Sequence, residues 1–491
     1  MEHPRPSAES ARFVDPPDGP PVDRPVDRRG ILRGAATGAM LGMLPLLASS
    51  GVAQAGAVSS GSTERRHGPQ SEPSQRSGPV SQACGPLPLL GGEEFPIGLF
   101  WPPPPFETTP ERYAEIRQAG FTFVITGNYL ADSHILRRVC EVAEQIGLKV
   151  LVASDPDVGN LARNFTITDD RSVPLSITPA DARTLAQRAL GHYQGFDSFA
   201  GFNLYDEPSA PAFASLSKAY EAVREVAPRV LPYSNLFPGN GDGYRDYVRA
   251  YVDTVKPSVL SFDRYPILTN GEDQNYFDNW AIIRREGLRA NLPTWVYIQS
   301  VQYANHRFPN EAEVRWQIAI SLAYGAKGIQ YFTWWQPDPA RGEAFGPAII
   351  DLEGERTALY EASKKINTAW LQPIGRRLKP LTSESVQHAN EDPLPPGTEG
   401  FASDSHLTAV SGDAVVIGRF TEAGNSARKY VFVANRLPGK PAKATLTVDP
   451  SVVKEIALYD PAKDEYVPQR DPRRVRVSLE AGSAKLYRLD G

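Results

Sequence analysis

Short apolar runs alternate with amphipathic helical patterns between residue 93 and about residue 376. Segments such as Glu111–Ala119, Asp132–Ile146 and Glu355–Trp370 place apolar residues at helical spacing. Eight runs rich in β-branched and aromatic residues predict strands: Pro96–Trp101, Phe121–Gly127, Lys149–Asp155, Ala200–Glu207, Val230–Phe237, Ser258–Pro266, Pro293–Ser300 and Gly328–Gln336. Eight strand and helix units over about 275 residues match a (β/α)8 barrel, an α/β fold of about 250 residues.

An open doubly wound sheet is the rival architecture for this alternation. Such a sheet usually carries a glycine-rich phosphate loop after its first strand, and the loop after Trp101 is instead the proline run 102–105. The barrel, over residues 93–376, is therefore the predicted fold.

The pattern changes after Arg377, where apolar and polar residues alternate in short runs such as 413–420, 430–435 and 474–479. Gly, Pro, Asn and Asp separate these runs at short spacing, which is typical of an antiparallel β-sandwich. We expect residues 377–491 to form this domain and to support the barrel rather than to bind sugar.

The first residues of the chain have the pattern of a targeting signal. Arg28 and Arg29 precede an apolar run and an Ala53-Gln54-Ala55 site, which resembles a twin-arginine signal peptide over residues 1–55. The run is too short and too interrupted by glycine and proline for a membrane span, which needs about 20 apolar residues. We expect a secreted, extracellular protein with no stable membrane insertion after signal cleavage.

Residues 56–92 are rich in Ser, Gly, Pro and Gln, and this composition predicts a flexible linker. The two cysteines, Cys84 and Cys140, lie in no metal-binding spacing, and the sequence leaves open whether they form a disulfide.

Composition and net charge limit the kinds of molecule that the chain could bind. The chain has 491 residues, is 41% hydrophobic and carries a net charge of −5, so it has room for two domains and shows no sign of binding nucleic acid. A polar small substrate fits better, while the oligomeric state stays open.

Polar and aromatic residues gather at one end of the predicted strands. Active sites of such barrels lie at the carboxyl ends of the strands. The candidates there are Trp101, Asn128, Asp155, Asn203, Asp206, Glu207, Asn235, Asp263, Tyr265, Gln299, Trp334 and Trp335. Carboxylates, amides and indoles suit sugars, which offer hydroxyls for hydrogen bonds and C–H faces for stacking. Because Trp334 and Trp335 point to opposite sides of a strand, we expect one in the core and one as a sugar platform.

The Leu204-Tyr205-Asp206-Glu207-Pro208 stretch is the strongest single motif. It reads as a strand that delivers two carboxylates and is stopped by proline, although an acid beside proline also opens many helices. The gathering of polar groups at the other strand ends favours the catalytic interpretation.

Other barrel chemistries lack their residues. Lys149 and Lys327 stand at strand beginnings, on the wrong face for a Schiff base. Histidines fall in helices or loops, so we expect no metal and no cofactor. No serine nucleophile elbow is present in the sequence.

The remaining chemistry is that of carboxylates, and the chain resembles secreted (β/α)8-barrel glycoside hydrolases with a C-terminal β-sandwich. The motif around Glu207, the Tyr324-Gly325-Ala326-Lys327-Gly328 approach and the aromatic run 331–335 carry this resemblance. The largest clan has Asn-Glu after strand four and Glu after strand seven, whereas here Asp206 precedes Glu207 and strand seven ends in Gln299-Ser300.

Two mechanisms stay open at this point. The Asp206-Glu207 pair is similar to that of barrel hexosaminidases, in which the Asp orients the substrate's acetamido group and the Glu protonates the leaving oxygen. Alternatively, Glu207 pairs with Asp263, one acting as acid/base and the other as nucleophile or water-activating base. The sequence thus predicts a glycoside hydrolase acting on an oligosaccharide or glycoside with Glu207 as its essential acid. The alternative is a noncatalytic carbohydrate-binding barrel.

Overall fold

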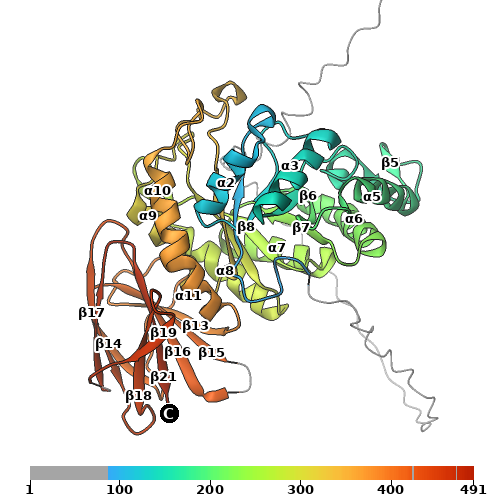
Figure 1. The fold of residues 1–491 in the computed structure, drawn as a ribbon. Coiled ribbons are helices and arrows are strands. Elements are labelled where there is room, and N and C mark those ends of the chain that lie inside the picture. The colour runs from blue at the N-terminus through green and yellow to red at the C-terminus, as the bar shows by residue number, and fades with distance from the viewer. Residues whose placement is uncertain (1–86, 423–424, 472) are drawn as a thin grey trace, which may run out of the picture. The chain divides into compact units, whose positions relative to one another are not determined.

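The computed structural model describes residues 87–422, 425–471 and 473–491 (Figure 1). The predicted signal peptide, most of the predicted linker and Cys84 lie outside these residues. Cys140 is a free, buried cysteine, and burial raises the pKa of its thiol to about 12. In the described part of the chain, no helix has the length and apolar character that crossing a membrane requires.

Eight parallel strands close into a barrel, which confirms the predicted fold. The order around the barrel is β1-β12-β11-β8-β7-β6-β3-β2. The strands are β1 (Ile97–Phe100), β2 (Phe123–Ile125), β3 (Lys149–Val152), β6 (Phe199–Asp206), β7 (Leu231–Leu236), β8 (Leu260–Asp263), β11 (Thr294–Gln299) and β12 (Gly328–Phe332). Their carboxyl ends therefore meet at one mouth.

Helices surround the barrel strands (Figure 1). They are α2 (Pro110–Gln118), α3 (Ser133–Ile146), α5 (Pro179–Tyr193), α6 (Phe213–Val226), α7 (Gly241–Val255), α8 (Tyr276–Arg289), α9 (Glu311–Ala323), α10 (Ala358–Ile366) and α11 (Gln372–Leu378). Several begin at a capping side chain, since Thr178 and Asn310 form capping boxes with Asp181 and Glu313. Short elements in the loops are α4 (Leu161–Asn164), β4 (Thr166–Ile167), β5 (Ser176–Ile177), β9 (Ile267–Leu268) and β10 (Gly271–Glu272).

Large side chains fill the barrel interior opposite glycines. Phe123 and Trp295 belong to the interior cluster, and a Cβ at Gly98 or Gly328 would lie 2.2 Å or 2.6 Å from their rings. Close packing of this kind leaves no space for a pore.

The end of the predicted linker contacts this interior. Leu87, Leu89 and Leu90 pack against the same cluster, and Lys379 Nζ donates to the carbonyls of Gly91 and Gly92.

The last part of the chain forms the predicted β-sandwich. One sheet has the order β13-β15-β16-β21-β18-β19, and the other has the order β14-β17-β20. The strands are β13 (Thr382–Ala389), β14 (Leu407–Gly412), β15 (Val415–Glu422), β16 (Asn425–Asn435), β17 (Ala442–Val448), β18 (Glu455–Asp460), β19 (Glu465–Pro468), β20 (Arg474–Leu479) and β21 (Ala484–Asp490). Strand β20 alternates exposed and buried residues, and its buried side chains enter a core shared by the two sheets.

Helix α9 packs on the sandwich. Trp316 Nε1 donates to the carbonyl of Arg436 at 3.0 Å, and the Arg436 guanidinium lies 4.5 Å from the ring centre of Phe277 and pairs with Glu272 at 3.1 Å. The main cluster accordingly runs without a break from the helices into sandwich residues such as Phe420.

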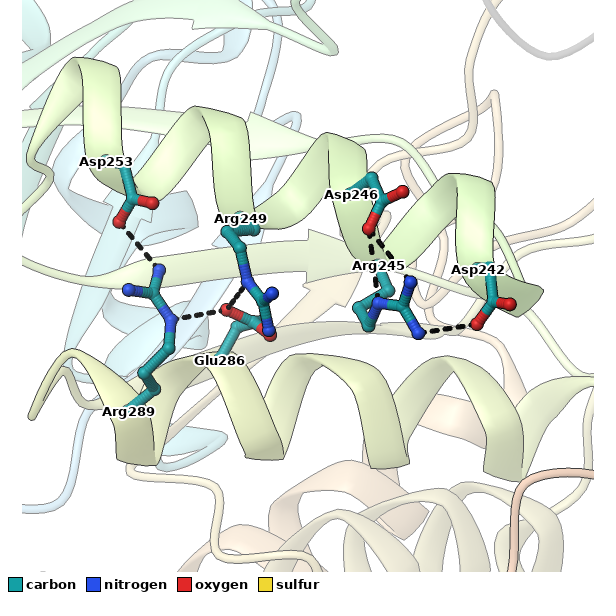
Figure 2. A network of polar contacts seen from close by, with 7 residues as sticks. All are labelled: Asp242, Arg245, Asp246, Arg249, Asp253, Glu286 and Arg289. Carbon is teal, nitrogen blue, oxygen red and sulfur yellow. Dashed lines mark hydrogen bonds and ion pairs between the residues drawn. The ribbon is translucent and has the colours of Figure 1, made fainter. Parts of the chain in front are cut away.

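Ion pairs join α7 to α8 along one side of the barrel (Figure 2). Glu286 is fully buried as a side chain and accepts from Arg249 Nη2 at 2.8 Å and Arg289 Nε at 2.6 Å. Arg289 also reaches Asp253 of α7 at 2.7 Å. The buried carboxylate is thus satisfied by two arginines whose outer parts stay in solvent.

Candidate active site

The backbone at the end of β6 is unusual where the motif ends. Strand β6 ends at Asp206, and Glu207 follows with φ at 54°, in the left-handed region that non-glycine residues rarely adopt. The Glu207 N–H donates to the Asn235 carbonyl of β7 at 2.8 Å. Such strained positions cluster at functional sites because the surrounding structure must hold them.

Asp263 ends strand β8 two strands away. It is buried, and Asn235 Nδ2 donates to its Oδ1 at 2.8 Å. Ser261 Oγ donates in turn to Asn235 Oδ1 at 2.9 Å. A neutral amide therefore holds one carboxylate oxygen of Asp263.

Three carboxyls interact electrostatically at this mouth. Burial raises the pKa of Glu207 well above its ordinary value, and the charge of Asp263, followed by that of Asp206, raises it further. Burial and Asp206 also raise the pKa of Asp263, against the hydrogen bond from Asn235. Burial raises the pKa of Asp206, and Arg163 opposes this rise. The structure thus brings Asp206, Glu207 and Asp263 together.

Two charged residues of this site lie outside the barrel strands, Arg163 in the short helix α4 and Glu343 in a loop. Arg163 of α4 donates Nη2 to the Asp206 carbonyl at 2.8 Å, and its guanidinium lies 4.9 Å from the ring centre of Tyr205. Burial raises the pKa of Glu343, whose charge also acts on Glu207. Neither residue was predicted from the sequence, because neither follows a barrel strand directly.

Aromatic hydroxyls surround the acids. Tyr265 stacks on Phe332 with ring centres 5.2 Å apart and meets Tyr303 edge-on at 5.9 Å. The charges of Asp263 and Glu207 both act on Tyr265 and Tyr303. Of these three aromatic residues, only Tyr265 was a predicted candidate.

Trp101 and Asn128 lie at the mouth of the barrel, but each already contacts another residue of the protein. Trp101 is buried, has φ at 60°, and carries the Arg341 guanidinium 4.2 Å from its ring centre. Asn128 Nδ2 donates to the Pro102 carbonyl at 2.9 Å. A sugar could stack on that face of Trp101 only after Arg341 moved.

Asp155 and Gln299, two further candidates, make hydrogen bonds to the surrounding structure instead of facing a substrate. Asp155 accepts from the Tyr193 hydroxyl at 2.6 Å and from two N–H groups of its own loop. Gln299 Nε2 donates to the Arg307 carbonyl at 2.7 Å, and its Oε1 accepts from the Ile267 N–H at 3.0 Å.

Both predicted tryptophans of strand eight are buried in the main cluster. Trp334 packs edge-on against Phe121 and Tyr360, and the Arg112 guanidinium lies 5.4 Å from the ring centre of Trp335. The structure therefore leaves neither tryptophan open as a platform.

Asn203 is a predicted amide with an unpartnered buried oxygen in the described part of the chain. It is buried in β6, and its Oδ1 has no hydrogen-bond partner among the described residues. Buried polar atoms are nearly always paired in folded proteins, so this oxygen is a candidate acceptor for a substrate hydroxyl.

Residues for other chemistries lie elsewhere. Lys327 Nζ donates to the carbonyls of Leu378 and Leu381, and Lys149 Nζ donates to that of Asp197, all away from the mouth. The described ranges contain no group of three or more His, Cys, Asp or Glu residues that could hold a metal ion.

Comparisons with known proteins give likenesses in structure only. No family model matches the chain, and no curated protein matches it. The solved structures with a similar fold include a protein described as a glycoside hydrolase, with 12% identity over 81% of this chain and 92% of that chain and a TM-score of 0.47. A family 5 glycoside hydrolase from Bacteroides vulgatus has 11% identity over 81% and 89% at a TM-score of 0.48. A family 27 β-L-arabinopyranosidase from Geobacillus stearothermophilus has 9% identity over 82% and 98% at 0.45. At these scores and identities, the likenesses carry no argument about the reaction or substrate of this chain.

Proposed function

We propose that this protein is a glycoside hydrolase that cleaves glycosidic bonds in an oligosaccharide or glycoside by carboxylate chemistry. The observation that carries the proposal is the group of Asp206, Glu207 and Asp263, in which burial raises all three pKa values and the neighbouring carboxyls raise those of Glu207 and Asp263 further. A carboxyl group that keeps its proton near neutral pH is what protonation of a leaving oxygen requires.

The surroundings of the two acids support different roles for them. Asp263 receives a hydrogen bond from Asn235, and Arg264 beside it also favours its ionised form. The charges of Asp263, Asp206 and Glu343 raise the pKa of Glu207, and Arg163 acts against them. Glu207 is therefore proposed as the general acid, and Asp263 as the nucleophile or the base that activates water.

The route through a substrate acetamido group is the competing mechanism. It would assign the orienting role to Asp206, which precedes Glu207 at the end of β6. The larger effect of Asp263 on Glu207 favours the pair Glu207 and Asp263. A carboxyl separation of about 5 to 5.5 Å would then indicate retention, and one of about 6.5 to 9.5 Å inversion.

Three substitutions test the function and separate the mechanisms. Glu207→Gln keeps the shape and removes the proton donor, so turnover of substrates with poor leaving groups should fall by about 10² to 10⁴. Asp263→Asn should be as damaging if the carboxylate pair acts, whereas Asp206→Asn should be the damaging one if the acetamido route acts. Asp242→Asn is the matched control, because the Asp242 side chain in α7 is 87% exposed.

The assay is hydrolysis of a glycan panel and of activated aryl glycosides by the purified chain. Full activity of Glu207→Gln on a natural glycan would end the proposal. Binding of a glycan without turnover would instead identify a noncatalytic carbohydrate-binding barrel.

We further propose that the protein is secreted through the twin-arginine route. Support comes from Arg28, Arg29 and the Ala53-Gln54-Ala55 site in the sequence. Replacing both arginines by lysine should abolish export, and the secreted wild-type chain should begin near Gly56. Secreted material whose N-terminal sequence still starts at Met1 would contradict this.

A further inference from the structure

A chain of hydrogen bonds rises through the barrel interior to Asp263. Ser261 and Asp263 lie two residues apart on β8, and Tyr233 and Asn235 lie two residues apart on β7, so each pair faces one side of its strand. Asn235 and Ser261 are direct partners across the two strands. All four side chains are buried.

Each member of the network has a defined partner. Ser261 Oγ donates to Asn235 Oδ1 at 2.9 Å and accepts from Gln330 Nε2 at 3.1 Å. The Tyr233 hydroxyl donates to Ser261 Oγ at 2.7 Å, and its oxygen also lies 3.1 Å from Gln330 Oε1. Gln330 comes from β12, on the far side of β11, and is also buried.

The proton count fixes which way the Asn235 amide faces. Tyr233 and Gln330 both donate to Ser261 Oγ, so the single Ser261 proton is left for Asn235 Oδ1. Asn235 Nδ2 must then face Asp263 Oδ1 at 2.8 Å and the Leu236 carbonyl at 3.4 Å. The reversed amide would set its oxygen against both of these acceptors, which is unfavourable while Asp263 is ionised.

We propose that Ser261 is a positioning residue for Asp263, acting through Asn235, with Tyr233 and Gln330 holding the Ser261 hydroxyl in place. The inference rests on the proposed function in assigning Asp263 to the reaction. Its physical content is that the network stabilises the ionised form of Asp263 and keeps one carboxylate oxygen free for the substrate.

Other groups also act on Asp263 and remain unchanged in the test. They are Asp206 and Glu207 at the end of β6, Arg264, Tyr244 and Tyr247 of α7, and Tyr265, Tyr297 and Tyr303. A substitution at Ser261 alters none of these charges, so a change at Asp263 would report the network.

The test is Ser261→Ala in the full chain, labelled with carboxyl-13C aspartate. Without the hydroxyl, Asn235 can turn its oxygen toward Asp263, so the pKa of Asp263 should rise by about half a unit to one unit. Carbon NMR measures this pKa directly, and Asp263→Asn assigns the signal. Ser261→Thr restores a hydroxyl and should restore the wild-type pKa.

Ser321→Ala is the matched control, because Ser321 is an equally buried serine that donates to the Gln317 carbonyl in α9 at 2.6 Å. It should leave the pKa of Asp263 unchanged. An Asp263 pKa that is the same in wild type and Ser261→Ala would overturn the inference.

Failure of the proposed function would give a different result from failure of the inference about Ser261. Turnover that survives Glu207→Gln and Asp263→Asn would remove the glycosidase mechanism, while the NMR comparison would still decide what Ser261 does. If both hold, the acid limb of the pH profile should move upward in Ser261→Ala together with the measured pKa.

Discussion

Glu207 carries two unfavourable features in the folded protein. Its φ of 54° lies in the left-handed region, which costs a non-glycine residue about 1 to 3 kcal/mol. Its carboxyl is also largely removed from water beside Asp263 and Asp206. Residues that destabilise a fold in this way are commonly retained for activity.

Replacing the ionisable carboxyl of Glu207 should therefore stabilise the protein at pH 7. Burial and the neighbouring charges raise the pKa of folded Glu207 above that of the unfolded chain, so the folded state binds more protons between these two values. Stability that Glu207 supplies at low pH is lost as pH rises through this window. Glu207→Gln should thus melt at a higher temperature than wild type at pH 7, and the gap should close toward pH 4. A calorimetric pH series measures it, and a lower Tm for Glu207→Gln at pH 7 would contradict the burial of this charge.

Asp206→Asn should move the pH profile of the enzyme. The charge of Asp206 raises the pKa of both Glu207 and Asp263, so its removal should shift both limbs of the rate profile to lower pH. The rate at the optimum should fall by less than about tenfold if Asp206 acts only through its charge. Rates with an activated aryl glycoside between pH 4 and 10 test this, and Asp242→Asn should leave both limbs in place. Unchanged limbs in Asp206→Asn would separate Asp206 from the pair.

The sequence predicted where the acidic side chains lie, but it could not show which hydrogen bonds the amide side chains make. Asp206, Glu207 and Asp263 follow from strand ends, since the carboxyl ends of barrel strands meet. Gln299 has the same position in its strand, yet the backbone of Ile267 in β9 and of Arg307 before α9 uses its amide, and no local pattern reveals that. Glu343 lies in an irregular loop and carries no periodic signal at all.

At the scale of elements, periodicity located the long segments and missed the short ones. All eight barrel strands were predicted, and each proved as long as or shorter than its apolar run. The two-residue strands β4, β5, β9 and β10 were missed, because two residues cannot display a period.

The α7–α8 contact offers a prediction for a pair of elements (Figure 2). Burial raises the pKa of Glu286, but hydrogen bonds from Arg249 and Arg289 outweigh it and hold the pKa below its usual value. Glu286→Gln removes these charge-assisted bonds and should lower the unfolding free energy by about 1 to 3 kcal/mol. Since the folded pKa is lowered, the loss should be complete above the unfolded pKa near 4.5 and vanish as pH falls below the folded pKa.

Asp242 supplies the control within the same network. It pairs with Arg245 at 2.6 Å, but 87% of its side chain is exposed. Asp242→Asn should change stability by less than about 1 kcal/mol, as exposed pairs usually do. Equal effects of the two substitutions in urea unfolding would show that burial does not set the strength of these pairs.

At the scale of the whole molecule, backbone contact joins barrel and sandwich. A Cβ at Gly418 of β15 would lie 2.5 Å from the Ala323 carbonyl oxygen at the end of α9, and one at Gly482 would lie 2.0 Å from that of Ala312. The pattern in the sequence predicted both domains, but it could not show where glycine lets them touch. That information lies in the pairing of distant segments and not in any local period.

Gly418→Ala tests whether this joint makes one cooperative unit. Alanine fits a strand better than glycine, so the substitution should stabilise β15 unless α9 occupies the space. Because it does, we expect a loss of about 1 to 3 kcal/mol through overpacking. Gly439→Ala is the control, since nothing lies within 4 Å of its Cβ position, and it should be neutral. Calorimetry should show one transition that moves to lower temperature in Gly418→Ala, because the main cluster runs from α9 into the sandwich. Two separate transitions would mean that the sandwich unfolds without the barrel. An unchanged Tm in Gly418→Ala would mean that the contact between Gly418 and Ala323 does not bind the two domains together.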